Sequence, residues 1–149
     1  MKDRTRARGI ALQALYELDI TNHPVGVVIK ERIADSVLDD ELMQFFRTIV
    51  LGVWPIRQEL DNFIAEHAPD WPLDQVAIID RNIIRIALWE FAVADDTPLK
   101  VAINEAVELA KTFGSDSAPR FVNGVLGSLA DRQHEITQSI QQMQSQKTD

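Results

Sequence analysis

The fold of this chain is decided by one nearly all-apolar segment, residues 76–94, which reads VAIIDRNIIRIALWEFAVA. If the segment is wound as a helix, its large apolar side chains point to almost every side; they are Ile78, Ile79, Ile83, Ile84, Ile86, Leu88, Trp89 and Phe91. A helix without a polar face is typically buried at the centre of a domain. The segment therefore predicts a central helix with the other elements packed around it.

Helix signals continue on both sides of this segment, and strand signals are nearly absent. The expected helices cover about residues 3–20, 25–38, 40–67, 76–94, 98–113 and 116–134. Pro55 lies inside the third of these, so we expect a break near residues 51–55. Thr97 is a candidate N-cap before Pro98, and Gly114 is a candidate helix stop. The pattern predicts an all-α, single compact domain of about seven helices.

The chain has 149 residues, 46% of them hydrophobic, which fits one domain with an ample core. No linker is long enough to separate two domains. We expect the helical domain to span residues 1–135 and the Gln- and Ser-rich residues 136–149 to be disordered. The absence of cysteine excludes a disulfide framework, a Cys-ligated zinc site and thiol chemistry.

The net charge of −8 argues against a general nucleic-acid binder, because phosphate contacts supply most non-specific affinity. The charge is uneven, however: residues 1–10 hold four basic side chains and one acid. RNA binding is therefore expected only at a local basic patch, and weakly without a helper. No apolar run is long enough for a signal peptide or a membrane span, so we expect a cytoplasmic protein without a membrane partner.

The first expected helix has two contrasting sides. One side is apolar, with Ala7, Ala11, Ala14, Leu15 and Leu18. The opposite side carries Arg6, Gly9, Gln13 and Tyr16, with Arg8 beside it and Arg4 at the start of the helix. Arginine pairs with phosphate, Tyr16 offers a stacking surface for an unpaired base, and Gln13 can hydrogen-bond a base edge. The alternative is an ordinary solvated helix face with Tyr16 at the edge of the core.

Catalytic signals are weak. The three histidines lie in separate segments, without metal-binding spacing. Glu105 and Glu108 lie one turn apart and could share a proton or a metal, but such a pair is far more often a solvated face. Phe121 follows Pro119 and Arg120, at the edge of an apolar stripe, and its position alone favours a core-edge aromatic. We expect no enzyme, no metal site and no cofactor.

Four collinear blocks carry a resemblance to a known family. They are residues 100–114 (KVAINEAVELAKTFG), residues 120–126 (RFVNGVL), residues 80–90 (DRNIIRIALWE), and the pattern of Arg8 followed by residues 11–16 (ALQALY). Together with their spacing they cover most of residues 4–130. The chain resembles the NusB transcription antitermination family.

The resemblance implies an all-α NusB-like fold of two packed helical subdomains and a non-catalytic role. Proteins of this kind bind the boxA element of nascent RNA together with NusE, a ribosomal small-subunit protein. The pair acts in the RNA polymerase antitermination complex, notably on ribosomal RNA operons. An acidic chain is suited to attract a basic ribosomal protein.

The resemblance also implies roles for single residues. By position, the RNA-contacting residues are Arg4, Arg6, Arg8, Tyr16, Arg120 and Phe121, to which the first helix adds Gln13. This replaces the core-edge interpretation of Phe121. Asp80 corresponds to the NusE-facing surface, with Arg81 and Lys100 as weaker candidates nearby.

Three alternatives remain. NusB-like domains also occur fused to RNA methyltransferases, but this chain has no room for a methyltransferase domain. A second alternative is a protein-interaction module, for example a homodimer with its RNA face closed off. The third is a hydrolase that uses Glu105 and Glu108.

Overall fold

The computed structural model describes residues 2–148, apart from the side chains of residues 73, 147 and 148. The helices are α1 (Asp3–Ile20), α2 (Val25–Ala34), α3 (Asp40–Val53), α4 (Arg57–His67), α5 (Ile78–Leu88), α6 (Leu99–Phe113), α7 (Ala118–Ala130) and α8 (Gln133–Thr148). Short helical segments η1 (Trp54–Ile56), η2 (Leu73–Gln75) and η3 (Trp89–Val93) connect some of them. No strand occurs in this part of the chain, so the predicted all-α class is confirmed.

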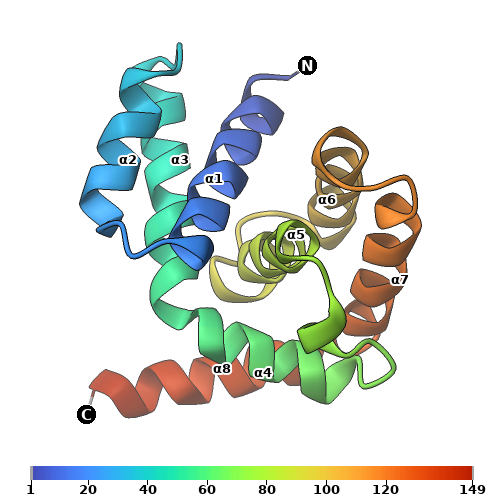
Figure 1. The fold of residues 1–149 in the computed structure, drawn as a ribbon. Coiled ribbons are helices and arrows are strands. Elements are labelled where there is room, and N and C mark those ends of the chain that lie inside the picture. Colours follow the sequence, from blue (N-terminus) through green and yellow to red (C-terminus); the bar gives the residue numbers. More distant parts are fainter. Residues whose placement is uncertain (1, 149) are drawn as a thin grey trace.

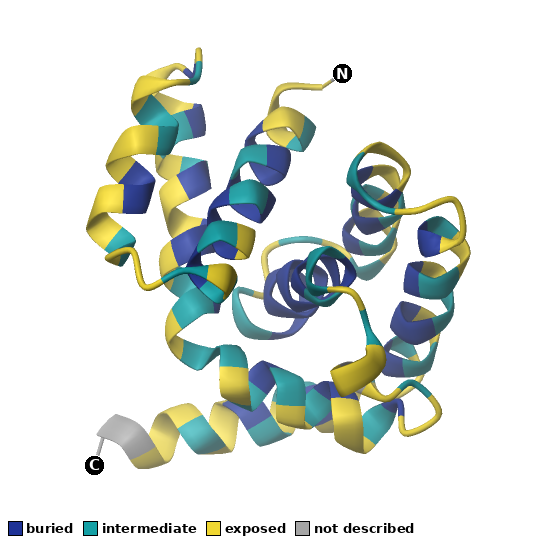
Figure 2. Ribbon diagram, viewed as in Figure 1, coloured by how far each residue is buried: buried dark blue, intermediate teal, exposed yellow. Residues whose placement is uncertain are grey.

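The central helix lies where its apolar sequence predicts. α5 continues directly into η3, a π-helical segment, and residues 82–92 are all buried. α5 packs against α1, α3, α4, α6 and α7, and Figure 1 shows it nearly end-on between the other helices. In Figure 2 the buried sides of these helices face the middle of the molecule. Charged residues of the central segment must therefore find partners inside the protein.

Two groups of helices flank α5. α1, α2 and α3 pack together on one side, and α6 and α7 pack together on the other (Figure 1). This is the arrangement of two packed helical subdomains that the family resemblance implies. None of the described helices has the length and apolar character that a membrane crossing requires.

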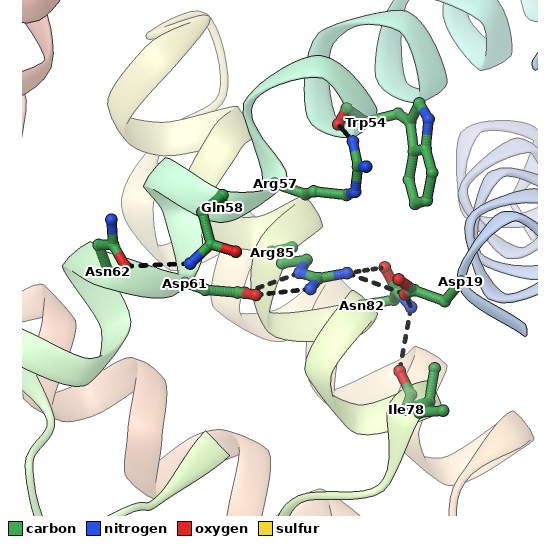
Figure 3. A network of polar contacts seen from close by, with 9 residues as sticks. All are labelled: Asp19, Trp54, Arg57, Gln58, Asp61, Asn62, Ile78, Asn82 and Arg85. Atoms are coloured by element: carbon green, nitrogen blue, oxygen red, sulfur yellow. Dashed lines mark hydrogen bonds and ion pairs between the residues drawn. The ribbon is translucent and has the colours of Figure 1, made fainter. Parts of the chain in front are cut away.

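One buried network joins α1 and α4 to the central helix α5 (Figure 3). The Arg85 guanidinium donates to both carboxylate oxygens of Asp61 at 2.8 and 2.6 Å, and to Asp19 at 2.9 Å. Asn82 also donates to Asp19, at 2.7 Å. Burial lowers the pKa of Arg85, but the hydrogen bonds and charges of Asp61 and Asp19 outweigh it and leave the pKa raised. The network fixes the end of α1 and the middle of α4 on the central helix.

The predicted break near residues 51–55 is confirmed: α3 ends at Val53, and Pro55 lies in η1. Two other boundary predictions are wrong. α2 ends at Ala34 and not near Leu38, although Leu38 itself is buried. Thr97 does not cap α6, because its hydroxyl is directed to the Glu90 carboxylate at 3.4 Å.

The expected disorder of residues 136–149 is wrong for the described part. These residues belong to α8, which packs against η3. Ile136 and Ile140 are buried and Met143 is half-buried, which is a helical apolar stripe at spacings of four and three. The Gln-rich composition hid these few apolar residues. Residue 149 lies outside the described residues.

Candidate nucleic-acid interface

The first turns of α1 present two exposed arginines. The Arg4 guanidinium lies 4.7 Å from the centre of the Phe45 ring on α3, in a cation–π contact. Arg6 donates to the backbone carbonyl of Val37 at 2.9 Å. Both contacts are at the surface, so they orient the guanidinium groups without removing them from solvent. This end of α1 matches the predicted basic patch.

Arg8 does not belong to that patch, and its predicted role in RNA contact is corrected. Its side chain is buried, with 3% of the residue exposed. Its guanidinium donates to Glu90 at 2.8–3.0 Å and lies 3.4 Å from a carboxylate oxygen of Glu105. The missed signal is Glu90 itself, because a carboxylate inside an otherwise apolar central helix requires a buried cation.

Gln13 and Tyr16 lie further along α1. The Gln13 side-chain oxygen accepts from Arg32 on α2 at 3.1 Å, and Arg32 also pairs with Glu17. Gln13 is therefore held against α2 and is only half-exposed. Tyr16 is 36% exposed and remains available to a partner.

A groove connects the start of α1 with α7 across the outer face of α6. It encloses about 650 Å³, and it is lined by Lys2, Thr5, Asn104, Glu105, Val107, Glu108, Lys111, Thr112 and Asn123. That volume lies within the roughly 300–1,000 Å³ of ordinary small-molecule sites. Its asparagines and Lys111 are not among the predicted site residues. The available signal was the polar spacing of residues 104, 108, 111 and 112 on one face of a helix.

The predicted pair on α7 is divided by the geometry of the helix. Arg120 is exposed and shares a helix face with Asn123, three residues on, so it lies on the groove side. Phe121 is half-buried, and its ring meets the Trp71 ring edge-on, with centroids 5.3 Å apart. Trp71 was not predicted and covers part of the Phe121 ring.

The predicted partner residues do not form one cluster. Asp80 is 8% exposed, and within the described residues its Oδ1 atom has no hydrogen-bond partner. Burial raises the pKa of the Asp80 carboxyl above its ordinary value. A Cβ atom on Gly114, directly after α6, would lie 3.1 Å from this Oδ1. Arg81 is the half-buried neighbour of Asp80.

Lys100 belongs to a different part of the surface. It is exposed in the first turn of α6, and Gly114 follows the last turn. The helix between them is about 20 Å long at 1.5 Å per residue. Lys100 therefore lies far from Asp80 and close to the end of α6 that faces the start of α1.

The two glutamates of the hydrolase alternative have separate partners. Glu105 accepts from the Thr5 hydroxyl at 2.7 Å and faces Arg8. Glu108 pairs with Lys111 at 3.2 Å. Among residues 2–148, no group of three or more His, Cys, Asp or Glu side chains is placed to hold a metal ion. The two carboxylates therefore bind different partners and are not hydrogen-bonded to each other.

Taken together, the helices and this surface define an all-α protein with a basic first helix and a polar groove between α1 and α7. The model of the NusB family matches residues 5–131. The chain belongs to the NusB family.

Relatives and solved structures agree with this assignment. The transcription antitermination protein NusB of Roseiflexus castenholzii is 48% identical over 134 residues, covering 89% of this chain and 94% of the relative. Its counterpart from Bacillus subtilis is 43% identical over 129 residues, covering 87% and 95%. The structure of T. maritima NusB superposes with a TM-score of 0.74 at 26% identity, covering 91% of this chain and 90% of that one. A structure of the antitermination factors NusB and NusE with double-stranded RNA shares the fold, with a TM-score of 0.77 at 23% identity, covering 93% and 98%.

Proposed function

We propose that this chain is a transcription antitermination protein that binds boxA RNA together with the ribosomal protein NusE and promotes processive transcription of ribosomal RNA operons. The observation that carries the proposal is the 43–48% identity to transcription antitermination proteins over most of both chains. The fold shared with NusB in a complex with NusE and RNA supports it. The role is not catalytic, and it places the protein in the cytoplasm with the RNA polymerase antitermination complex.

The RNA surface proposed here starts at Arg4 and Arg6 and continues along the groove to Arg120. Exposed guanidinium groups at both ends of a polar groove can hold phosphates and fix the position of a strand. The chain as a whole carries a charge of −8, which repels RNA away from this surface. RNA affinity without a partner should therefore be low.

The proposed NusE surface includes Asp80, whereas Tyr16, exposed on α1, is kept as a proposed RNA contact. The Asp80 carboxylate, in the first turn of α5, is a negative group that would attract a basic partner. Arg81 lies beside it, whereas the position of Lys100 at the far end of α6 makes it a candidate for RNA and not for NusE.

The test is a titration of boxA RNA with the full chain, with and without NusE. We expect much tighter binding when NusE is present, with a log–log salt slope of about −0.7 per phosphate contacted. Arg6→Ala should weaken binding of every RNA sequence and reduce that slope. Arg47→Ala, an exposed arginine on α3, is the matched control. If NusE leaves the RNA affinity unchanged, the proposed function is wrong.

A further inference from the structure

The groove over α6 holds two side-chain amides that the protein does not use. Asn104 on α6 and Asn123 on α7 are both exposed and both line the groove. Neither amide makes a hydrogen bond in the part of the chain that the structure describes. Each therefore offers a donor and an acceptor to a ligand, the pair of groups that an asparagine presents to the edge of a base.

The groove lining carries two carboxylates and two ammonium groups, so their charges balance. Glu105 accepts from Thr5 and lies 3.4 Å from Arg8, whose closer partner is Glu90, and Glu108 pairs with Lys111. Lys2 lies on the α1 side of the groove, and Lys111 lies in its wall. Lys111 is 59% exposed, and a surface ion pair such as that with Glu108 is weak, so both lysines can contact phosphates while the two amides offer hydrogen bonds to bases.

The lining is that of a nucleic-acid site and not of a protein interface. Val107 is its one apolar residue, and it is half-buried. The centre of a protein interface is depleted in charge and rich in aromatic and large apolar side chains. This groove has charged side chains in its lining and no aromatic one. The groove also shares Lys2 and Thr5 with a hollow at the basic start of α1 that Arg4 lines.

We propose that this groove binds unpaired bases of the RNA and that Asn104 and Asn123 recognise base edges, while Lys2 and Lys111 contact phosphates. The inference rests on the proposed function and adds the site at which sequence is read. Base contacts specify and phosphate contacts position, so the two pairs of residues should give different binding signatures.

The experiment measures binding of the full chain, with saturating NusE, to boxA RNA and to a panel of boxA RNAs with single base changes. We expect Asn104→Ala and Asn123→Ala each to weaken binding of the unchanged RNA by about 5- to 100-fold. Each should also abolish discrimination at one base position and leave the salt slope unchanged. Lys2→Ala should instead weaken every RNA equally and reduce the salt slope by about 0.7.

Asn62→Ala, which changes an exposed asparagine on α4, is the matched control and should bind as the original chain does. Circular dichroism should show unchanged helical content in all variants, because the substituted side chains are exposed. If the original chain binds boxA RNA with NusE but the Asn104 and Asn123 variants keep its full base discrimination, the inference is wrong and the proposed function stands.

Two further outcomes would overturn the inference. If the asparagine variants lose NusE affinity in the absence of RNA, the groove is a protein-docking site. If the original chain binds no RNA even with NusE, the proposed function fails and the inference fails with it.

Discussion

Arg8 on α1 and Glu90 on η3 form a fully buried ion pair, in which the guanidinium donates three hydrogen bonds at 2.8–3.0 Å. The pair joins the first helix to the end of the central helix. Ordinary surface ion pairs contribute little to stability, but removing one partner of a buried pair leaves an uncompensated charge. An arginine that looks like part of an RNA-binding motif is therefore an element of the core.

Arg8→Ala should lower the free energy of unfolding by about 3–5 kcal/mol, because Glu90 would remain buried without its partner. Chemical denaturation of the full chain measures this. The double variant Arg8→Met with Glu90→Leu should recover much of the loss, and Arg47→Ala should change the value by less than about 0.5 kcal/mol. An Arg8→Ala protein of unchanged stability would show that the pair is not structural.

Asp80→Asn should stabilise the protein at neutral pH. Burial raises the pKa of Asp80, so the folded state favours the protonated carboxyl. Its stability contribution is complete below the unfolded-state pKa of about 4 and is lost as the pH rises through the folded-state value. The difference in unfolding free energy between the variant and the original chain should therefore be largest near pH 7 and shrink below about pH 4. A difference that does not depend on pH would argue against this cause.

Tyr16→Ala should weaken boxA RNA binding in the presence of NusE by about 1–3 kcal/mol if Tyr16 stacks on a base. Tyr16→Phe keeps the ring and should retain most of the affinity. RNA and NusE affinities are measured separately. If Tyr16→Ala lowers only the affinity for NusE, the side chain belongs to the partner surface.

Ile140→Ala should lower the free energy of unfolding by about 2 kcal/mol or more, because the side chain is buried where α8 packs on the protein. Gln141→Ala, an exposed neighbour, is the control and should have almost no effect. Thermal unfolding of the two variants gives the comparison. Equal midpoints would mean that α8 is detached in solution, as its composition alone suggested.

The central helix and the break at Pro55 were predictable because both depend on local sequence: the first on apolar side chains on every side, the second on a missing N–H group. The role of Arg8 in the core was not predictable from local sequence, because it depends on Glu90, 82 residues away. Asn104 and Asn123 were missed for a related reason. Each is an ordinary exposed residue on its own helix, and only the packing of α6 against α7 brings them to one groove.

Arg85 donates hydrogen bonds to carboxylates on two helices that are far apart in the chain. These are Asp19 at the end of α1 and Asp61 in α4. Detaching α1 or α4 would remove one of the two carboxylates that pair with the buried Arg85 guanidinium, so partial unfolding of either helix costs free energy. The helices that meet at Arg85 should consequently exchange their slowest amide hydrogens with one common opening free energy, as a single cooperative unit. A ligand that binds at the end of α1 would then shift α1, α4 and α5 together as one rigid unit, without unfolding any of these helices locally.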